Sequence, residues 1–247
     1  MKRAIVFGAT GGIGQEICRD LAAEGWSLYL HYNSHEQTAL DLGKELFAKY
    51  PSQDFLRQDF LPIKLDFASS DAELADFVKK LLPVNAAVFA QGITKYGFLG
   101  DETLDNITKL INVNLTVPIK LTKLLEPQLM RQDYSRIVYL GSVYGGAGSA
   151  LEAVYSATKG GLTRFTQAYA REVASNNLTV NVIAPGAVKT NMNAIFSEDT
   201  IQEVQDEIPM GRWAKANDIS YWVTTLLNKR SGYLTGQTIY VTGGWLL

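Results

Sequence analysis

Ala4-Ile5-Val6-Phe7, followed at once by Gly8-Ala9-Thr10-Gly11-Gly12-Ile13-Gly14, is the stretch that decides the fold of this chain. The apolar run predicts a buried strand, and the glycines predict a tight turn into a helix, because residues without a Cβ atom fit such a turn. The turn also lets backbone N–H groups approach a phosphate at the start of that helix. The spacing is GxxxGxG rather than the commoner GxGxxG of dinucleotide folds, and a plain tight turn is the alternative. Its place between strand and helix favours a cofactor site formed by Gly8, Thr10, Gly11, Gly12, Ile13 and Gly14.

Short apolar runs and longer segments of helical periodicity alternate along the rest of the chain. The predicted strands are Ala4–Phe7, Ser27–Tyr32, Leu61–Leu65, Ala86–Ala90, Arg136–Gly141, Thr179–Ile183 and Thr238–Val241. The predicted helices include Ile13–Glu24, Gln37–Lys49, Asp71–Leu82 and Tyr155–Ser175, and Tyr50–Phe60 is expected to be a surface loop. This alternation predicts one α/β domain over residues 1–247, a Rossmann-type doubly wound parallel sheet of about seven strands with helices on both faces.

The composition narrows the possible functions. Of the 247 residues, 47% are hydrophobic and 19% are charged, which is typical of a globular protein. The net charge of −2 gives no basic field, so nucleic acid is not an expected partner. Neither a signal peptide nor an apolar run long enough to span a bilayer is visible, which predicts a cytoplasmic protein without a membrane partner. The single cysteine, Cys18, is expected to be packed. His31 and His35 are expected at the surface, because no third ligand is spaced to form a metal site with them.

The end of the second predicted strand bears on the choice of cofactor. Folds that bind NAD usually place a carboxylate there to hold the ribose 2′-hydroxyl. Here the residues are Tyr32, Asn33 and Ser34, and the next acid is Glu36. A carboxylate would repel a 2′-phosphate, whereas Asn33 and Ser34 can donate hydrogen bonds to it. The segment therefore predicts NADP(H) as the cofactor, with a polar loop of no special function as the alternative.

Tyr155 and Lys159 are the candidates for acid–base chemistry. Of the twelve tyrosines, only Tyr155 is followed four positions later by a lysine, and on a helix this spacing places both side chains on one face. A nearby ammonium is expected to lower the pKa of the phenol from about 10 and to ease proton transfer to an alkoxide. Ser142 lies at the carboxyl end of the fifth predicted strand, where its hydroxyl can bind a carbonyl oxygen.

Taken in order, these motifs resemble the short-chain dehydrogenase/reductase family from the Gly8–Gly14 turn to the C-terminus. The resemblance implies an oxidoreductase with the catalytic residues Asn114, Ser142, Tyr155 and Lys159. In such enzymes Asn114 would hold a water in a relay with Lys159, which also binds the nicotinamide ribose. The resemblance further implies that Asp66 contacts the adenine of the cofactor and that Thr190 lies beside its amide and phosphates. The implied contacts are Asp66, Phe67, Gly92, Tyr155, Lys159, Pro185, Gly186, Val188 and Thr190.

Two departures from the family pattern occur near the cofactor site. Phe89-Ala90-Gln91-Gly92 stands where the family usually has Asn-Asn-Ala-Gly, and Phe7 stands where it usually has Thr. The family's asparagines mainly support the sheet and the cofactor wall, so Ala90 affects local detail rather than the chemistry. A catalytically inactive NADP-binding regulator with this fold is the alternative from another class, and retention of all four catalytic residues argues against it.

The end of the chain resembles 3-oxoacyl-acyl-carrier-protein reductases. Tyr233–Gln237 and the final Gly243-Gly244-Trp245 carry this resemblance, which implies a homotetramer built partly through the last strand. Those enzymes dock an acidic carrier protein on basic residues, whereas Asp133 and Asn176 occupy the corresponding positions here. The segment Ser197–Glu207 contains five acidic residues and no basic one, for which a solvated helix face is the simplest interpretation.

A narrower resemblance is to the reductases that act on elongation factor P. The segments that carry it are His31-Tyr32-Asn33, Glu152, Ala187-Val188, Thr190-Asn191-Met192, Glu207-Ile208-Pro209 and the final Gly-Gly-Trp. Those enzymes reduce a 5-aminopentanone group on a lysine of that translation factor to the aminopentanol. The resemblance implies a substrate loop near residues 190–212 and substrate contacts from Glu152 and Met192. A carboxylate interacting with the helix dipole is the alternative interpretation of Glu152, and acyl-carrier-protein reduction is the alternative function.

Overall fold

Seven strands form one parallel sheet in the order β3-β2-β1-β4-β5-β6-β7. The structure is a computed structural model that describes residues 2–50, 58–190 and 197–246. The strands are β1 (Arg3–Phe7), β2 (Ser27–Tyr32), β3 (Phe60–Lys64), β4 (Ala86–Phe89), β5 (Ser135–Leu140), β6 (Leu178–Pro185) and β7 (Thr238–Val241). The predicted doubly wound parallel sheet is therefore confirmed.

The inner strands are covered on both faces, which explains their continuous apolar sequences. Every residue of β2, β4, β5 and β6 is buried. Side chains alternate along β1, so that Ile5 and Phe7 enter one core layer while Ala4 and Val6 enter the other. A parallel sheet needs this double cover because its crossover helices lie on both faces.

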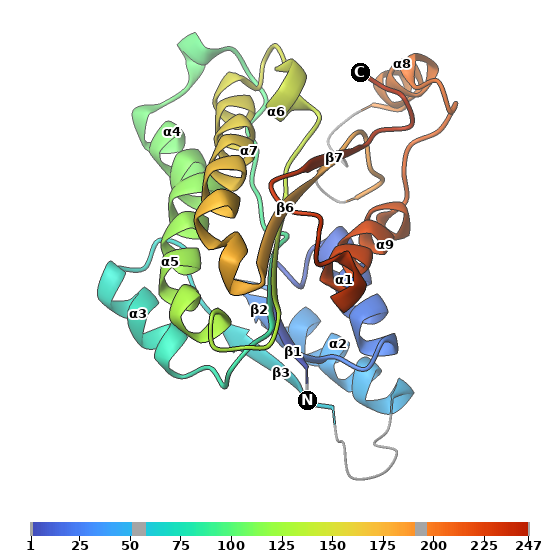
Figure 1. Ribbon diagram of the computed structural model, residues 1–247. Coiled ribbons are helices and arrows are strands. Elements are labelled where there is room, and N and C mark those ends of the chain that lie inside the picture. The colour runs from blue at the N-terminus through green and yellow to red at the C-terminus, as the bar shows by residue number, and fades with distance from the viewer. Residues whose placement is uncertain (1, 51–57, 191–196, 247) are drawn as a thin grey trace.

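Helices supply the two covering layers. The α-helices are α1 (Gly12–Ala23), α2 (Glu36–Lys49), α3 (Asp71–Lys79), α4 (Leu104–Ile111), α5 (Val117–Leu129), α6 (Tyr144–Ala147), α7 (Ala153–Val173), α8 (Glu198–Glu207) and α9 (Ala216–Leu227). Helices α3, α4, α5 and α7 lie on one side of the sheet in Figure 1, and α1, α2 and α9 lie on the other. Leu121 and Leu162 belong to the first core layer, and Ile17, Cys18 and Ile219 belong to the second, so the expected packing of the cysteine is confirmed.

The predicted element bounds differ from the observed ones by at most three residues. The largest difference is in α3, which ends at Lys79 rather than at Leu82. Helices α4, α5, α6 and α9 were not among the predicted elements, and α5 contains Pro127, a residue that argues against a helix. Of the predicted loop Tyr50–Phe60, residues 51–57 lie outside the described part of the chain, and Phe60 already begins β3.

The order of the strands creates a crevice at the carboxyl end of β1. The chain passes from β1 to β2 and β3 on one side and returns to β4 on the other. Open parallel sheets bind ligands where the strand order reverses in this way. The glycine turn after β1 and Ser142 after β5 lie at this end. Across the described residues, no helix is long and apolar enough to cross a membrane, and no group of three acidic, histidine or cysteine side chains is placed to hold a metal.

Candidate active site

The turn between β1 and α1 is shaped by close backbone approaches. Gly8 has a φ of +78°, and a Cβ atom there would lie 2.6 Å from the backbone nitrogen of Gln91. A Cβ atom on Gly14 would overlap the carbonyl oxygen of Gly8. The N–H groups in the first turn of a helix have no partner within that helix, and α1, which begins at Gly12, has no side-chain cap to bind them. The turn therefore fits the diphosphate of a dinucleotide.

A cavity of about 270 Å³ joins the predicted cofactor residues to the predicted catalytic residues. The predicted residues that line it are Ile13, Gly92, Ser142, Glu152, Tyr155, Lys159, Pro185, Gly186, Val188 and Thr190. Gly12 lies against Thr190, because a Cβ atom on Gly12 would be 3.1 Å from the Thr190 Cγ2 atom. Met192, predicted as a substrate contact, lies outside the described residues.

The residues predicted to bind the adenosine half lie after β2 and β3, apart from this cavity. Asn33, Ser34 and Asp66 are exposed, as contact with a ligand requires. The Asp66 carboxylate already accepts a hydrogen bond from the Ala68 backbone N–H at 2.8 Å. The ring of Phe67 is buried in the core, so only the backbone of this residue can reach a cofactor.

Tyr32 is also buried, and its hydroxyl donates a hydrogen bond to Glu36 Oε1 at 2.8 Å. This bond raises the pKa of Tyr32, because the carboxylate disfavours the phenolate. The Tyr32 hydroxyl is thus already committed to Glu36, in the first turn of α2. Of the three residues predicted at the ribose end, Asn33 and Ser34 are the ones whose side chains are exposed.

His31 is buried, so the prediction that it lies at the surface is wrong. Only 3% of its surface is exposed, whereas His35 is exposed as predicted. Its Nδ1 atom accepts a hydrogen bond from the Gly8 N–H at 3.0 Å, and its Nε2 atom lies 3.0 Å from the Leu65 carbonyl oxygen. A polar residue at the end of an apolar strand suggested solvent, but β2 is covered on both faces along its whole length.

Ser142, Tyr155 and Lys159 meet at the carboxyl end of β5. Tyr155 and Lys159 lie one turn apart on α7, and the Lys159 Nζ atom is 5.6 Å from the centroid of the Tyr155 ring. The Lys159 ammonium donates a hydrogen bond to the Leu140 carbonyl oxygen at 2.7 Å. The Ser142 hydroxyl interacts with the Tyr155 phenol, and its Oγ atom accepts a hydrogen bond from the Tyr144 backbone N–H at 3.1 Å. The predicted catalytic side chains thus share one site.

The ionisation of these groups differs from the prediction. Burial raises the pKa of Tyr155 to about 12, although the hydrogen bond with Ser142 opposes the change. The expected lowering by Lys159 is wrong, because the ammonium is directed to the Leu140 carbonyl rather than to the phenol oxygen. Burial also lowers the pKa of Lys159 to about 8. At neutral pH Tyr155 is therefore a phenol and Lys159 is largely an ammonium.

Asn114 lies behind Lys159 in a π-helical segment, Asn112–Thr116, that joins α4 to α5. Its Nδ2 atom donates to the Ile93 carbonyl oxygen at 2.8 Å, and its Oδ1 atom accepts from the Ile93 N–H at 2.9 Å. A Cβ atom on Gly92 would lie 3.5 Å from the Lys159 Nζ atom and 3.7 Å from the Asn114 Oδ1 atom. The asparagine side chain therefore fixes the segment after β4, next to the lysine.

Glu152 immediately precedes α7 but does not cap it. Its Oε1 atom accepts a hydrogen bond from the Thr94 hydroxyl at 2.5 Å, and its side chain lines the 270 Å³ cavity. Burial raises the pKa of Glu152, and the bond with Thr94 opposes this. The carboxylate is thus held at the cavity by a residue on a different segment, a contact that no sequence pattern indicated.

Aromatic side chains that the sequence did not identify form another wall of the cavity. They are Tyr96, Tyr144, Trp213 and Trp245. The rings of Tyr144 and Trp245 meet edge to face, with centroids 5.8 Å apart. The Trp245 indole donates a hydrogen bond to Glu207 Oε2 at 3.0 Å, which ties the last residues to the end of α8. The five acidic residues of α8 are exposed, so the interpretation as a solvated helix face is confirmed.

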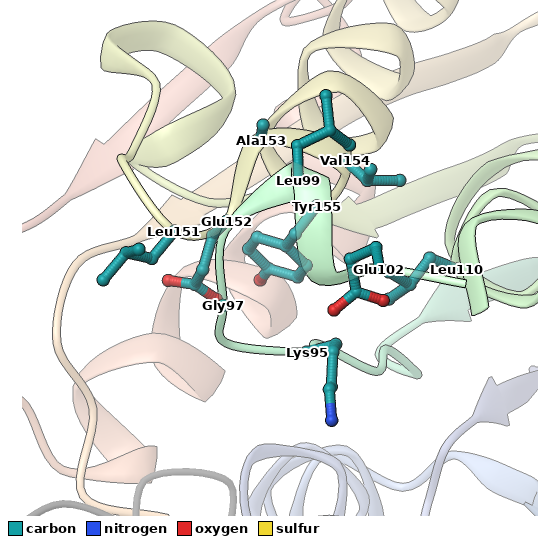
Figure 2. A pocket seen from close by; sticks show the side chains of 10 residues that line it. All are labelled: Lys95, Gly97, Leu99, Glu102, Leu110, Leu151, Glu152, Ala153, Val154 and Tyr155. Carbon is teal, nitrogen blue, oxygen red and sulfur yellow. The ribbon is translucent and has the colours of Figure 1, made fainter. Parts of the chain in front are cut away.

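A smaller cavity lies on the other side of Tyr155. Figure 2 shows the carboxylates of Glu152 and Glu102 on either side of the Tyr155 ring. Lys95 also lines this cavity and is exposed. The Oε2 atom of Glu102 is buried and has no hydrogen-bond partner among the described residues. Glu102 does not line the larger cavity, which makes it a useful comparison for Glu152.

Comparisons with known proteins agree with this arrangement over the whole chain. Residues 8–246 match the family model described as enoyl-(acyl carrier protein) reductase. The chain is 34% identical to the protein named "Uncharacterized oxidoreductase YmfI" of Bacillus subtilis (strain 168), over 99% of this chain and 98% of that protein. It is 32% identical to the 3-oxoacyl-[acyl-carrier-protein] reductase FabG of Staphylococcus aureus (strain Mu50), over 98% of this chain and 97% of that protein.

Solved structures show the same fold. A blue fluorescent protein from a metagenomic library, in complex with NADPH, matches with a TM-score of 0.89 and 30% identity, over 100% of this chain and 98% of that chain. A short-chain dehydrogenase/reductase from Serratia marcescens matches with a TM-score of 0.90 and 25% identity, over 100% and 98%. Together with the glycine turn and the Ser142, Tyr155 and Lys159 site, these matches show that the chain belongs to the short-chain dehydrogenase/reductase family of NAD(P)-dependent oxidoreductases.

Proposed function

We propose that this protein is an NADPH-dependent carbonyl reductase that converts a ketone into a secondary alcohol. The observation that carries the proposal is that Ser142, Tyr155 and Lys159 line the larger cavity together with Ile13 of the glycine turn. When bound, the cofactor supplies the hydride. The Gly8–Gly14 turn and Thr190 would hold its phosphates, and Lys159 would hold its nicotinamide ribose.

The side chains of this site supply the proton and the hydrogen bonds. Tyr155 donates its proton to the developing alkoxide, because its raised pKa keeps the phenol protonated at neutral pH. The Ser142 hydroxyl donates a hydrogen bond to the same oxygen and stabilises its charge. The positive charge of the Lys159 ammonium stabilises the negative charge that develops on the substrate oxygen. Both ends of the Asn114 side chain are bound to Ile93, so its backbone carbonyl is the group left to hold a water of a proton relay.

The pKa of Lys159 predicts how the rate depends on pH. A lysine is charged below its pKa, so a pKa of about 8 gives a charged side chain at neutral pH and a neutral one in mild alkali. We expect kcat/KM for NADPH, which reports the free enzyme, to fall as pH rises through about 8. The profile is measured with purified enzyme between about pH 6 and about pH 10. A rate that stays level across this range would show that the charge on Lys159 does not contribute.

The end of β2 supports NADPH over NADH. Asn33 and Ser34 are exposed there and can donate hydrogen bonds to a 2′-phosphate. The nearby Glu36 carboxylate is bound to the Tyr32 hydroxyl at 2.8 Å. A solved structure that this chain resembles at 30% identity holds NADPH. These observations favour the phosphorylated cofactor.

For the substrate, we propose an amine-bearing ketone, the 5-aminopentanone group on a lysine of elongation factor P. Among the described residues that line the larger cavity, Glu152 is the only acid and Lys159 is the only base. Lys159 would be taken up by the cofactor ribose, and Thr94 binds only the Oε1 atom of Glu152, so the Glu152 carboxylate is the charged group left for the substrate. Its carboxylate would attract a primary ammonium and direct the ketone toward Ser142 and Tyr155. A substrate on a translation factor would place the enzyme in the cytoplasm.

The second candidate function is reduction of a 3-oxoacyl group on an acyl carrier protein. The 32% identity to FabG and the description of the matching family model favour it. Against it stand Asp133 and Asn176, which are exposed and not basic at the positions where the family resemblance implies carrier docking. The amine-bearing ketone is therefore the better candidate substrate.

A substrate comparison tests the proposed function. The purified enzyme is given 5-aminopentanone-modified elongation factor P, a free amine-bearing ketone, or an acetoacetyl thioester, each with NADPH and with NADH, and loss of the reduced cofactor is followed by absorbance. We expect the modified protein to be the best substrate and NADPH the better cofactor. A preference for the thioester would make the second candidate correct, and equal use of NADH would contradict the cofactor assignment.

Replacing Glu152 by glutamine should weaken reduction of the amine-bearing ketone selectively. Loss of the charge pair is expected to lower kcat/KM for that substrate about 10-fold, the effect of about 1.4 kcal/mol. Reduction of a neutral ketone of the same length should change little. Because Glu152 is only partly buried, the selective loss should shrink as salt is added.

Glu102→Gln is the matched control for this prediction. It removes a carboxylate from the other side of Tyr155 without touching the larger cavity, so the preference for the amine should remain. Equal losses on charged and neutral ketones in Glu152→Gln would mean that the carboxylate has a structural role. The acyl-carrier-protein function would then take first place.

We also propose that the protein is a homotetramer built partly through the last strand. Tyr240 in β7 and the neighbouring Tyr233 and Leu234 are exposed in the single chain, and so are Tyr221 and Trp222 of α9. Large apolar side chains exposed on the last strand and on α9 support contact with another copy of the chain. Light scattering on the purified protein measures its mass in solution, which tests whether four chains associate.

A further inference from the structure

His31 lies between the two loops that the cofactor would contact. It is in β2, between the glycine turn after β1 and the loop after β3. Its Nδ1 atom is 3.0 Å from the Gly8 backbone nitrogen, and its Nε2 atom is 3.0 Å from the Leu65 carbonyl oxygen. A carbonyl oxygen can only accept and an N–H can only donate, so the proton must be on Nε2 and the lone pair on Nδ1. One neutral tautomer satisfies both partners.

The surroundings keep the ring in that form. His31 is packed against Phe7 and Phe67, with ring centroids 5.3 Å away in both cases. Burial lowers its pKa to about 4, so the ring is neutral throughout the physiological range. A second proton, on Nδ1, would face the N–H of Gly8 and break the contact. Neither phenylalanine has a polar atom that could replace the histidine as an acceptor.

The backbone of His31 reinforces the same contact. Its carbonyl oxygen accepts a hydrogen bond from the Ala9 N–H at 3.1 Å, so the residue holds two consecutive amides of the turn. Gly8 is the point at which the turn takes its positive φ and packs against Gln91. A displacement here would move the amides that face the phosphates.

We infer that His31 is a positioning residue for the dinucleotide, which sets the glycine turn through Gly8 and ties it to the loop that begins at Leu65. The inference rests on the proposed cofactor, NADPH, but not on any ketone substrate. Asp66, which the family resemblance places at the adenine, follows Leu65 directly. One side chain thus links the phosphate end of the site to its adenine end, without touching the cofactor.

Two variants of similar size separate the two hydrogen bonds of the ring. In His31→Asn the amide oxygen can occupy the place of Nδ1 and accept from Gly8, whereas in His31→Gln the amide nitrogen can occupy the place of Nε2 and donate to Leu65. Both are compared with the unmodified full-length protein. The measurements are the Kd for NADPH by fluorescence titration, the KM for NADPH, the KM for a ketone and kcat at saturating NADPH. Circular dichroism establishes that each variant is folded.

We expect His31→Gln to raise the Kd and the KM for NADPH about 10-fold, because the Gly8 N–H loses its buried acceptor. His31→Asn should stay within about threefold of the unmodified protein, which is rescue by the variant that keeps the acceptor. The KM for the ketone and kcat should change little in either, since His31 does not line the cavity.

Two results would overturn the inference. One is an equal Kd for NADPH in the two folded variants, and the other is a loss confined to kcat or to the KM for the ketone. If the unmodified protein itself fails to bind NADPH, the proposed cofactor is wrong, and that outcome is distinct because it is seen before any substitution is made.

Discussion

Tyr155→Phe should lose nearly all ketone reduction while it still binds NADPH. The change removes one oxygen atom, the only donor on that side chain, so the alkoxide would have to take its proton from water. General acid catalysis contributes about 10²–10⁴-fold to a rate, and we expect kcat to fall by that factor. Steady-state kinetics with NADPH and a ketone measure the loss, and a fluorescence titration measures the unchanged Kd for NADPH.

Tyr169→Phe is the control for this experiment. Tyr169 lies on the same helix, and its hydroxyl donates to Glu126 at 2.6 Å, well away from the larger cavity. Tyr169→Phe also removes a phenol oxygen, but one that does not face the substrate, so activity should persist. If Tyr155→Phe retained full activity, the proton would come from another group and the proposed mechanism would be refuted.

Gly8→Ala should abolish cofactor binding, and Gly25→Ala should not. Both glycines have similar positive φ angles, +78° and +81°. A Cβ atom on Gly8 would lie 2.6 Å from the Gln91 nitrogen, whereas nothing lies within 4 Å of one on Gly25. Both variants therefore bear the cost of a left-handed backbone, about 1–2 kcal/mol, but only Gly8→Ala must also move the turn.

The two effects are separated by measuring the Kd for NADPH together with the free energy of unfolding. Because the displaced turn can no longer align its N–H groups with the phosphates, we expect Gly8→Ala to raise the Kd for NADPH about 100-fold, the effect of about 2.8 kcal/mol. Gly25→Ala should lower the free energy of unfolding and leave the Kd unchanged. Similar Kd values in the two variants would mean that the close approach at Gly8 does not shape the phosphate site.

Much of this fold can be predicted from local sequence, because each strand carries its own apolar run and β1 ends in a turn that glycines make possible. Two features escaped prediction for physical reasons. Helix α5 contains Pro127, which costs the helix one backbone hydrogen bond, but the packing of Leu121, Leu125 and Leu129 into the core stabilises the helix. His31 is polar, but its ring finds one donor and one acceptor inside the protein, so burial costs it little.

Some features of the candidate site can likewise be predicted from local sequence, and others cannot. Tyr155 and Lys159 are visible in the sequence because their spacing follows the helix period. The bond from Thr94 to Glu152 joins residues 58 positions apart, and no local pattern encodes it. The pKa of Tyr155 was predicted in the wrong direction, since the sequence shows that Lys159 is near but not that its ammonium binds Leu140.

The wall that contains Trp213 and Trp245 also gives the protein an optical signal of its own. Both indoles line the cavity, whereas Trp26 is buried in the core beyond it and Trp222 is exposed on α9. A reduced nicotinamide absorbs light at the wavelengths where tryptophan emits. Excitation energy of the two cavity indoles would therefore be transferred to a bound cofactor. Occupancy of the site is then readable as quenching of intrinsic emission, and replacing Trp245 by phenylalanine would remove a defined part of that quenching without any added label.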